Sequence, residues 1–113
     1  MEDGVMVITY ADNLVISLDI AKEMVEDRRQ FSGSIPLPLL VDIRGLASVD
    51  TPSRKYFATP GAVENVPVAA LLAKSLLSKL VGNIYITVDK PSLSIKLFTD
   101  HNKALTWLKK FRT

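Results

Sequence analysis

Apolar side chains gather in four short runs along the chain, bounded by turn residues such as Gly, Pro, Asp and Asn. Nearly continuous runs of this kind are typical of strands that are covered on both faces in a parallel sheet. The predicted strands are Val5–Tyr10, Pro38–Ile43, Val66–Leu72 and Ile95–Phe98. A further short segment, Leu14–Ser17, fits either an additional strand or the start of a helix.

The first and last helices are predicted from apolar residues that recur with the α-helical period. The first covers Leu18–Phe31, with Ser17 as its N-cap and Gly33 just beyond its end. The last begins after Asp100, a typical N-cap residue. Its apolar face consists of Ala104, Leu105, Trp107, Leu108 and Phe111.

The second helix is predicted from its start signal. Thr51 and Pro52 are a preferred pair for the N-cap and the first helical position. We expect this helix to reach Ala58 or Thr59 and the segment that begins at Gly45 to be a loop.

The second half of the third helix fits two interpretations. Apolar residues follow a helical period from Leu76 onward, and Ser75 is a suitable N-cap. Residues 83–88 also alternate like a strand, which would allow a hairpin with Ile95–Phe98. We expect a helix to about Asp89, because it preserves the alternation of strands and helices.

The alternation of four strands and four helices predicts an α/β fold. We expect a four-turn β/α superhelix, with a mainly parallel four-stranded sheet and helices packed on it. The chain has 113 residues, 48% of them hydrophobic and 23% charged. These values are ordinary for a folded protein, and we expect one domain over residues 1–113.

Several chemistries are not expected from this composition. The chain has no Cys and a single His, His101, so neither a thiolate nucleophile nor a zinc site is expected. The sequence contains no glycine-rich phosphate loop and no nucleophile elbow. We therefore expect no enzymatic activity, no metal and no cofactor.

Charge and hydropathy limit the expected partners and location. The net charge is +2 and the basic residues are dispersed, so nucleic acid is not an expected partner. No segment approaches the roughly 20 apolar residues of a membrane span. The acidic start differs from a signal peptide, and we expect a cytoplasmic protein.

The segment Leu39–Ser53 resembles the signature region of STAS domains, which occur in bacterial anti-sigma-factor antagonists and in sulfate-transporter tails. In that family an apolar strand ends in Asp, and an Asp-Ser-Ser-Gly tetrad then begins a helix. The corresponding residues here are Asp50, Thr51, Pro52 and Ser53. Thr51 therefore takes the place of the phosphoacceptor Ser, while Pro52 and Ser53 depart from the pattern.

The rest of the chain is similar to a bacterial subgroup of uncharacterised SpoIIAA-like, or STAS-like, proteins. The similarity rests on the strand Pro38–Arg44, on Arg54 and on the C-terminal segments Lys96–Asp100 and Ala104–Leu108, and it covers about Ser17–Phe111. It implies a SpoIIAA-like fold and a regulatory module that interacts with a partner protein.

Thr51 and Ser53 are candidate phosphoacceptors. A phosphate at the start of the helix would meet free backbone N–H groups, and Arg54 would lie one turn further along. The alternative is that Thr51 is a simple N-cap. Both interpretations are open at this point.

Asp42, Arg44, Asp50 and Arg54 are candidates for an anion or partner site. They lie at or after the end of a predicted central strand, where open α/β sheets place their ligand sites. The alternative is an exposed loop with weak local ion pairs.

The third helix carries more apolar residues than one small sheet needs. Leu76, Leu80, Ile84 and Tyr85 are therefore candidates for a self-association surface, which would make the protein a homo-oligomer. Alternatively, they would line a cavity for an apolar ligand or lipid, as in CRAL-TRIO domains of related topology. The expected partners are thus an unidentified protein, a second copy of the chain or an apolar ligand.

Overall fold

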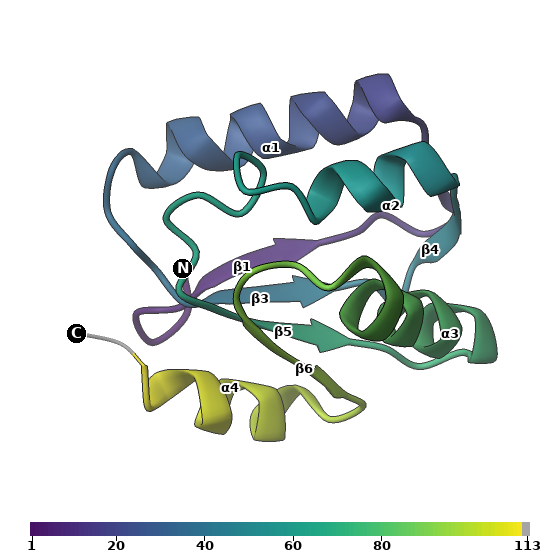
Figure 1. The fold of residues 1–113 in the computed structure, drawn as a ribbon. Coiled ribbons are helices and arrows are strands. Elements are labelled where there is room, and N and C mark those ends of the chain that lie inside the picture. Colours follow the sequence, from purple (N-terminus) through teal and green to yellow (C-terminus); the bar gives the residue numbers. More distant parts are fainter. Residues whose placement is uncertain (112–113) are drawn as a thin grey trace.

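A computed structural model of the protein describes residues 1–111 and contains a parallel four-stranded sheet. The strands are β1 (Met6–Thr9), β3 (Leu39–Asp42), β5 (Val68–Leu72) and β6 (Ser94–Phe98). They lie side by side in the order β1–β3–β5–β6, as Figure 1 shows, and every neighbouring pair is parallel. The predicted α/β fold class is confirmed.

Four α-helices cover the two faces of this sheet. They are α1 (Leu18–Ser32), α2 (Thr51–Phe57), α3 (Leu76–Ile84) and α4 (His101–Lys109). Successive residues of a strand point to opposite faces. Ala70 of β5 packs with α4, whereas its neighbours Ala69 and Leu71 face the other side, toward α1, α2 and α3. The sheet is therefore the middle of three layers.

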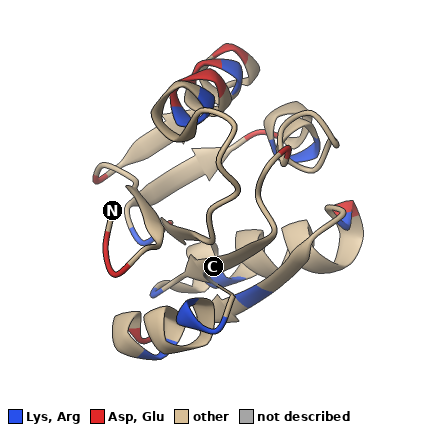
Figure 2. Cartoon of the chain, turned by 90° about the vertical axis from the view of Figure 1, so that its left-hand side faces the viewer, with Lys and Arg blue, Asp and Glu red and all other residues tan. Residues whose placement is uncertain are grey.

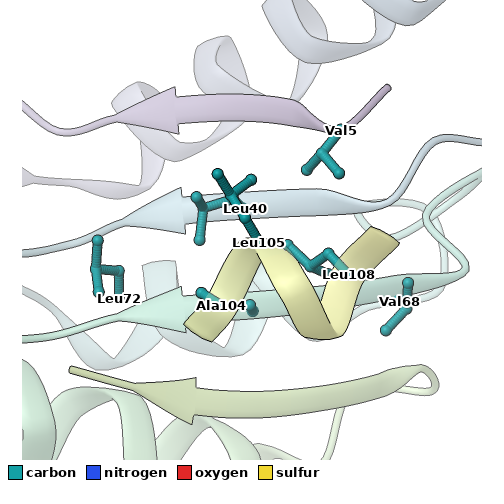
Figure 3. Packing of buried hydrophobic residues seen from close by; sticks show 8 residues of the cluster. Val5, Leu40, Val68, Leu72, Ala104, Leu105 and Leu108 are labelled. Atoms are coloured by element: carbon teal, nitrogen blue, oxygen red, sulfur yellow. The ribbon is translucent and has the colours of Figure 1, made fainter. Parts of the chain in front are cut away.

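The core under α4 is closely packed (Figure 3). Leu40 of β3, Leu72 of β5 and Leu108 of α4 are fully buried in one cluster. Trp107 packs beside this cluster, with its ring centroid 5.6 Å from that of Phe98. Phe111 lies beyond the end of α4 and is partly exposed, so it is not a helical core residue as predicted.

A second, two-stranded parallel sheet joins β2 (Leu14–Ile16) to β4 (Leu46–Val49). The first segment is thus a strand rather than the start of a helix. The prediction of a loop after Gly45 is wrong for the residues of β4. A Cβ atom at Gly45 would lie 2.5 Å from the backbone oxygen of Ala11, so the absent side chain allows the two backbones to approach closely.

The third helix continues beyond α3 as the π-helical turn η1 (Tyr85–Asp89). The predicted helix to Asp89 is confirmed, and the alternative hairpin over residues 83–88 is wrong. The N–H of Lys90 donates to the carbonyl oxygen of Tyr85 at 3.1 Å, and Lys90 itself adopts a left-handed conformation with φ of 49°. This conformation ends the helix before β6.

The surface of the protein carries both signs of charge. Acidic and basic residues are interleaved along α1, the uppermost helix in Figure 2. Within residues 1–111, no helix is both long enough and apolar enough to cross a membrane.

Candidate functional site

An apolar cavity of about 140 Å³ lies between the sheet and the three helices α1, α2 and α3. It is partly open to solvent, and all four strands of the main sheet contribute to its wall. The sheet side includes Ile8, Leu39, Val41, Ala69, Leu71 and Ile95. The opposite side includes Met24, Val25, Phe57, Val81, Gly82 and Tyr85.

Small side chains on α3 bring this helix close to the sheet. Ser78 is fully buried, and its hydroxyl accepts hydrogen bonds from the N–H groups of Lys74 and Ser75, both at 3.0 Å. A Cβ atom at Gly82 would lie 2.8 Å from Cδ1 of Leu97 in β6. The helix therefore packs through Ser and Gly, and this face closes one side of the cavity.

The leucines of α3 point the other way. Leu76 and Leu80 are 87% and 58% exposed, so the prediction that they line a cavity is wrong. Ile84 is half-buried and lies outside the cavity wall. Of the four residues predicted for this site, Tyr85 does line the cavity. The exposed leucines form a separate apolar surface on the outer side of α3.

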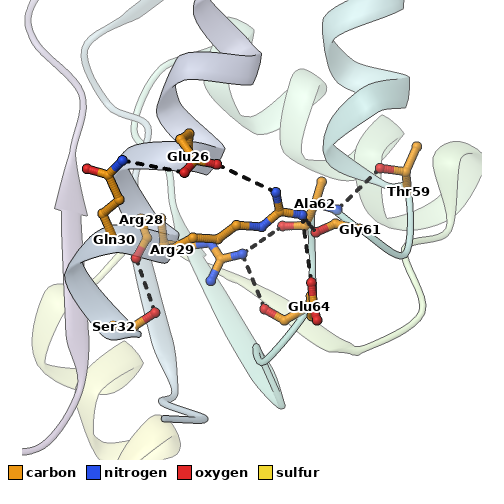
Figure 4. Close-up of polar contacts among 9 residues, drawn as sticks. All are labelled: Glu26, Arg28, Arg29, Gln30, Ser32, Thr59, Gly61, Ala62 and Glu64. Carbon is orange, nitrogen blue, oxygen red and sulfur yellow. Dashed lines mark hydrogen bonds and ion pairs between the residues drawn. The ribbon is translucent and has the colours of Figure 1, made fainter. Parts of the chain in front are cut away.

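Arg28 introduces a positive charge into the cavity wall and is 7% exposed. Its Nη2 atom donates to the carbonyl oxygens of Ala62 and Glu64, at 3.1 and 3.2 Å (Figure 4). Removal from water, followed by repulsion from Arg29, lowers the pKa of Arg28. Among the described residues, Arg28 forms no ion pair, and its Nε and Nη1 atoms make no hydrogen bond.

The second arginine of the wall, Arg54, is paired with an acid. Its Nε donates to Oδ2 of Asp89 at 2.5 Å, and the Asp89 side chain is 2% exposed. The Tyr85 hydroxyl also donates to the carbonyl oxygen of Phe57, at 2.6 Å. These two contacts connect η1 to α2 beside the cavity.

Two tyrosines add hydroxyl groups to the same wall. Burial raises the pKa of Tyr10 to about 12, and burial also raises the pKa of Tyr85. Both phenols are therefore neutral near pH 7. No hydrogen bond to the hydroxyl of Tyr10 occurs within residues 1–111.

The four residues predicted for an anion site do not meet in one place. Arg44 binds the carboxylate of Asp42 with both Nε and Nη2, at 2.9 and 2.7 Å, and this interaction lowers the pKa of Asp42. Asp42 lies two residues after Leu40 and therefore faces α4, on the side of the sheet opposite to Arg54. Asp50 lies at the start of α2, where its carboxylate binds Ser53 and only its backbone carbonyl oxygen accepts the Arg54 N–H, at 3.1 Å.

The predicted phosphoacceptors differ in access. The N-cap of α2 is Asp50 rather than Thr51, because its carboxylate accepts the Ser53 N–H at 2.8 Å and also the Ser53 hydroxyl. This hydrogen bonding lowers the pKa of Asp50. Ser53 is fully buried, whereas Thr51 is exposed at the first helical position. Of the two hydroxyls, that of Thr51 is accessible.

No group of three or more metal-binding side chains occurs in the part of the chain that the structure describes. His101 begins α4, and its Nε2 atom lies 3.2 Å from Oε1 of Glu2. This pair connects the first residues of the chain to α4.

The parallel sheet with helices on both faces defines an α/β protein. The chain is similar to an uncharacterised DUF3478 family protein with a SpoIIAA-like fold from Shewanella loihica PV-4. The match has a TM-score of 0.55 and 18% identity, and it covers 92% of this chain and 79% of the other. A protein of unknown function from Arthrobacter sp. FB24 is 27% identical over 96% of this chain and 94% of its own, with a TM-score of 0.37.

The family is established by the sequence itself. Residues 1–112 match the domain of unknown function DUF7793, and the chain belongs to this family. No curated protein matches the chain. The chain is thus a DUF7793 protein with a SpoIIAA-like fold.

Proposed function

We propose that the protein binds a small apolar ligand in the cavity between the sheet and helices α1, α2 and α3. The observation that carries this proposal is the apolar cavity of about 140 Å³ with an opening to solvent. A dry apolar cavity of about 150 Å³ accepts a molecule of the size of benzene. The cavity therefore fits a short aliphatic chain, in a binding protein that catalyses no reaction.

The proposal is tested by titrating ¹⁵N-labelled protein with 1-octanol and recording amide chemical shifts. The largest shifts are expected at cavity residues such as Val41 and Ala69. The variant Ala69→Leu places a larger side chain into the cavity, and we expect it to weaken binding at least about tenfold. Ala11→Leu, at an exposed position outside the cavity wall, is the matched control and should bind like the wild type.

Two results contradict this proposal. One is an absence of saturable shifts with 1-octanol in the wild-type protein. The other is equal binding by the Ala69→Leu variant, which would place the alcohol outside the cavity. Native mass spectrometry of freshly purified protein gives a further readout, because a retained ligand adds its own mass to that of the chain.

A second candidate function is interaction with a second copy of the chain. It is favoured by the exposed leucines of α3, Leu76, Leu77 and Leu80, on its outer side. Sedimentation velocity over a range of concentrations should show a dimer that is lost in the double variant Leu76→Ser/Leu80→Ser. A monomer at all concentrations would remove this candidate.

A regulatory form of this second candidate involves phosphorylation of Thr51. The exposed hydroxyl favours it, but Arg54, its expected partner, is already hydrogen-bonded to the buried Asp89. If a negative charge at Thr51 controls assembly, Thr51→Glu and Thr51→Ala should differ in their sedimentation behaviour. Equal behaviour of the two variants would argue against the switch. We place both candidate functions in the cytoplasm, a location with which a chain without cysteine is compatible.

A further inference from the structure

The Arg28 guanidinium has more hydrogen-bond donors than the surrounding protein satisfies. An arginine carries five N–H donors, and the two carbonyl oxygens of Ala62 and Glu64 both bind the Nη2 atom. Within residues 1–111, Nε and Nη1 have no acceptor. Among the described residues, the one fully enclosed side-chain nitrogen or oxygen atom without a partner is Nε of Arg29, so Nε and Nη1 of Arg28 remain accessible to water or to a ligand. Arg28 is 7% exposed and lines the cavity, so a ligand in the cavity lies within reach of these donors.

The charges in the cavity wall do not balance. The positive charge of Arg54 is compensated by the buried carboxylate of Asp89. Arg28 has no such partner, and the acidic side chain that influences it, that of Glu64, is instead 3.8 Å from Arg29 and 65% exposed. Buried charges are normally paired, because an unpaired charge loses its hydration without compensation. The wall thus carries one uncompensated positive charge.

The position of Arg28 gives the site two different ends. Ala62 and Glu64 belong to the segment that leads into β5 at Val68, so Arg28 lies near the edge of the sheet where the strands begin. From there the wall continues along the strands to Ile43 and Tyr10 and is mostly apolar. This arrangement suits a ligand with one charged end and an aliphatic remainder.

We propose that the ligand is an aliphatic monocarboxylate whose head group binds Arg28 and whose chain, about six to eight carbons long, fills the apolar part of the cavity. This inference rests on the proposed function, since it names the ligand class of the same cavity. A single negative charge matches the single uncompensated positive charge. A ligand with an ammonium group would be repelled by Arg28.

Three eight-carbon ligands with different head groups test this inference. Octanoate, 1-octanol and octylammonium are titrated into the wild-type protein by isothermal titration calorimetry. We expect octanoate to bind about tenfold tighter than 1-octanol, because hydrogen bonds between ionised groups are stronger than those to an alcohol. Octylammonium is expected to bind more weakly than either. Equal affinity for octanoate and 1-octanol would refute the carboxylate and leave the apolar site intact. Binding of neither would refute both proposals.

Variants then locate the head group. Arg28→Gln should remove the preference for octanoate over 1-octanol, whereas Arg28→Lys should retain part of it because the charge remains. Arg29→Gln removes the same charge from the neighbouring position outside the cavity wall and should leave the preference unchanged. A preference that survives in Arg28→Gln would refute the role of Arg28.

A measurement on the wild-type protein covers the case in which Arg28→Gln does not fold. The Nε–H resonance of Arg28 is followed by NMR during the titration with octanoate and with 1-octanol. A large shift with octanoate and a small shift with 1-octanol are expected. An unchanged resonance at saturation with octanoate would place the carboxylate elsewhere.

Discussion

Replacing Arg28 by Met removes two of the hydrogen bonds that hold the segment before β5 against α1. Met is flexible and apolar, so it retains the packing of the aliphatic stem and loses the guanidinium. The carbonyl oxygens of Ala62 and Glu64 then lose their donor, and the first of these two bonds is buried. The substitution therefore separates the contribution of the guanidinium from that of the stem.

The expected magnitude follows from these two hydrogen bonds. Bonds from a charged donor contribute about 1.5–3 kcal/mol each, and a buried carbonyl without a donor adds a penalty. The bond to Glu64 is partly exposed and counts for less. We expect Arg28→Met to lower the free energy of unfolding by about 2–4 kcal/mol, a large effect for one substitution.

Arg29→Met is the matched comparison, because it removes the same group from the next residue. Arg29 lies 3.8 Å from both Glu26 and Glu64, and its Nη2 atom also donates to the carbonyl oxygen of Gly61. That hydrogen bond is exposed and the Arg29 side chain is 37% exposed, so water replaces much of what the substitution removes. Exposed ion pairs contribute under about 1 kcal/mol, and the buried Nε of Arg29 has no partner to lose. We expect a loss of about 1 kcal/mol or less, which decreases further in high salt.

Urea unfolding measures both variants. Circular dichroism reports the helices, and the fluorescence of Trp107 reports the opposite side of the sheet. Coincident transitions with unchanged m-values would justify two-state free energies. If Arg28→Met costs no more than Arg29→Met, the hydrogen bonds of Arg28 do not hold this segment. In that event, amide exchange at residues 61–66 that is the same in Arg28→Met as in wild type would confirm that these hydrogen bonds do not hold the segment.

Three further predictions concern titration and close packing. Arg44 lowers the pKa of Asp42, so the ionised form stabilises the fold. This stabilisation is present above the unfolded pKa of about 3.9 and is lost as the pH falls through the lower pKa of the folded state. The measurement compares the urea midpoints of wild type and Asp42→Asn as a function of pH. Burial raises the pKa of Tyr10 to about 12, so stability should decrease as the pH rises from about 10 toward that value. The absorbance step at that pH should be absent in Tyr10→Phe. Gly45→Ala brings a Cβ atom against the backbone of Ala11, and we expect a loss of at least about 2 kcal/mol in urea unfolding.

Each of these predictions has a contrary outcome. If the stability difference between wild type and Asp42→Asn does not shrink below pH 4, roughly the unfolded pKa, the ion pair is not coupled to folding. Ionisation of Tyr10 near its ordinary pKa of about 10 would mean that its phenol is exposed to water. A Gly45→Ala variant with unchanged stability would mean that the backbone can move apart without cost.

The main sheet is predictable from the sequence because each strand is an apolar run between turn residues. The second sheet is not, because β4 is short and contains Ala and Ser among its four residues. Its formation depends on the close approach of Gly45 to Ala11, which are distant in sequence. A glycine that allows such an approach has no local signature that distinguishes it from a loop glycine.

Periodicity identified which residues of α3 are apolar but left open whether they form an exposed surface or line a cavity. The Leu residues suggested burial, since large apolar side chains usually drive packing. In the structure Ser78 and Gly82 face the sheet instead, because small side chains permit a closer approach and Ser75 and Ser78 satisfy each other in a capping box. An amphipathic pattern does not reveal a helix that packs through its small residues and exposes its leucines.

The buried position of Arg28 could have been predicted from the sequence, whereas the pairing of Arg54 with Asp89 could not. Arg28 follows Ala21 and Val25 at helical spacing, so it interrupts the buried stripe of α1. An arginine at such a position is a detectable signal of a buried polar role. Asp89 is 35 residues from Arg54, and no local pattern connects them. Their pairing depends on the π-helical turn that ends the third helix.

The cavity itself reduces stability, and this cost gives the binding proposal an independent test. An unfilled apolar cavity costs about 24 cal/mol per Å³, which for about 140 Å³ corresponds to at most about 3 kcal/mol. That is a large part of the 5–15 kcal/mol that typically stabilises a protein. A side chain that fills the space, as in Ala69→Leu, should therefore raise the urea midpoint while it weakens ligand binding, the trade-off expected of a functional cavity. A variant that lowers the midpoint instead would mean that the wall is too tightly packed to accept the added group, and that the space is not available to a ligand either.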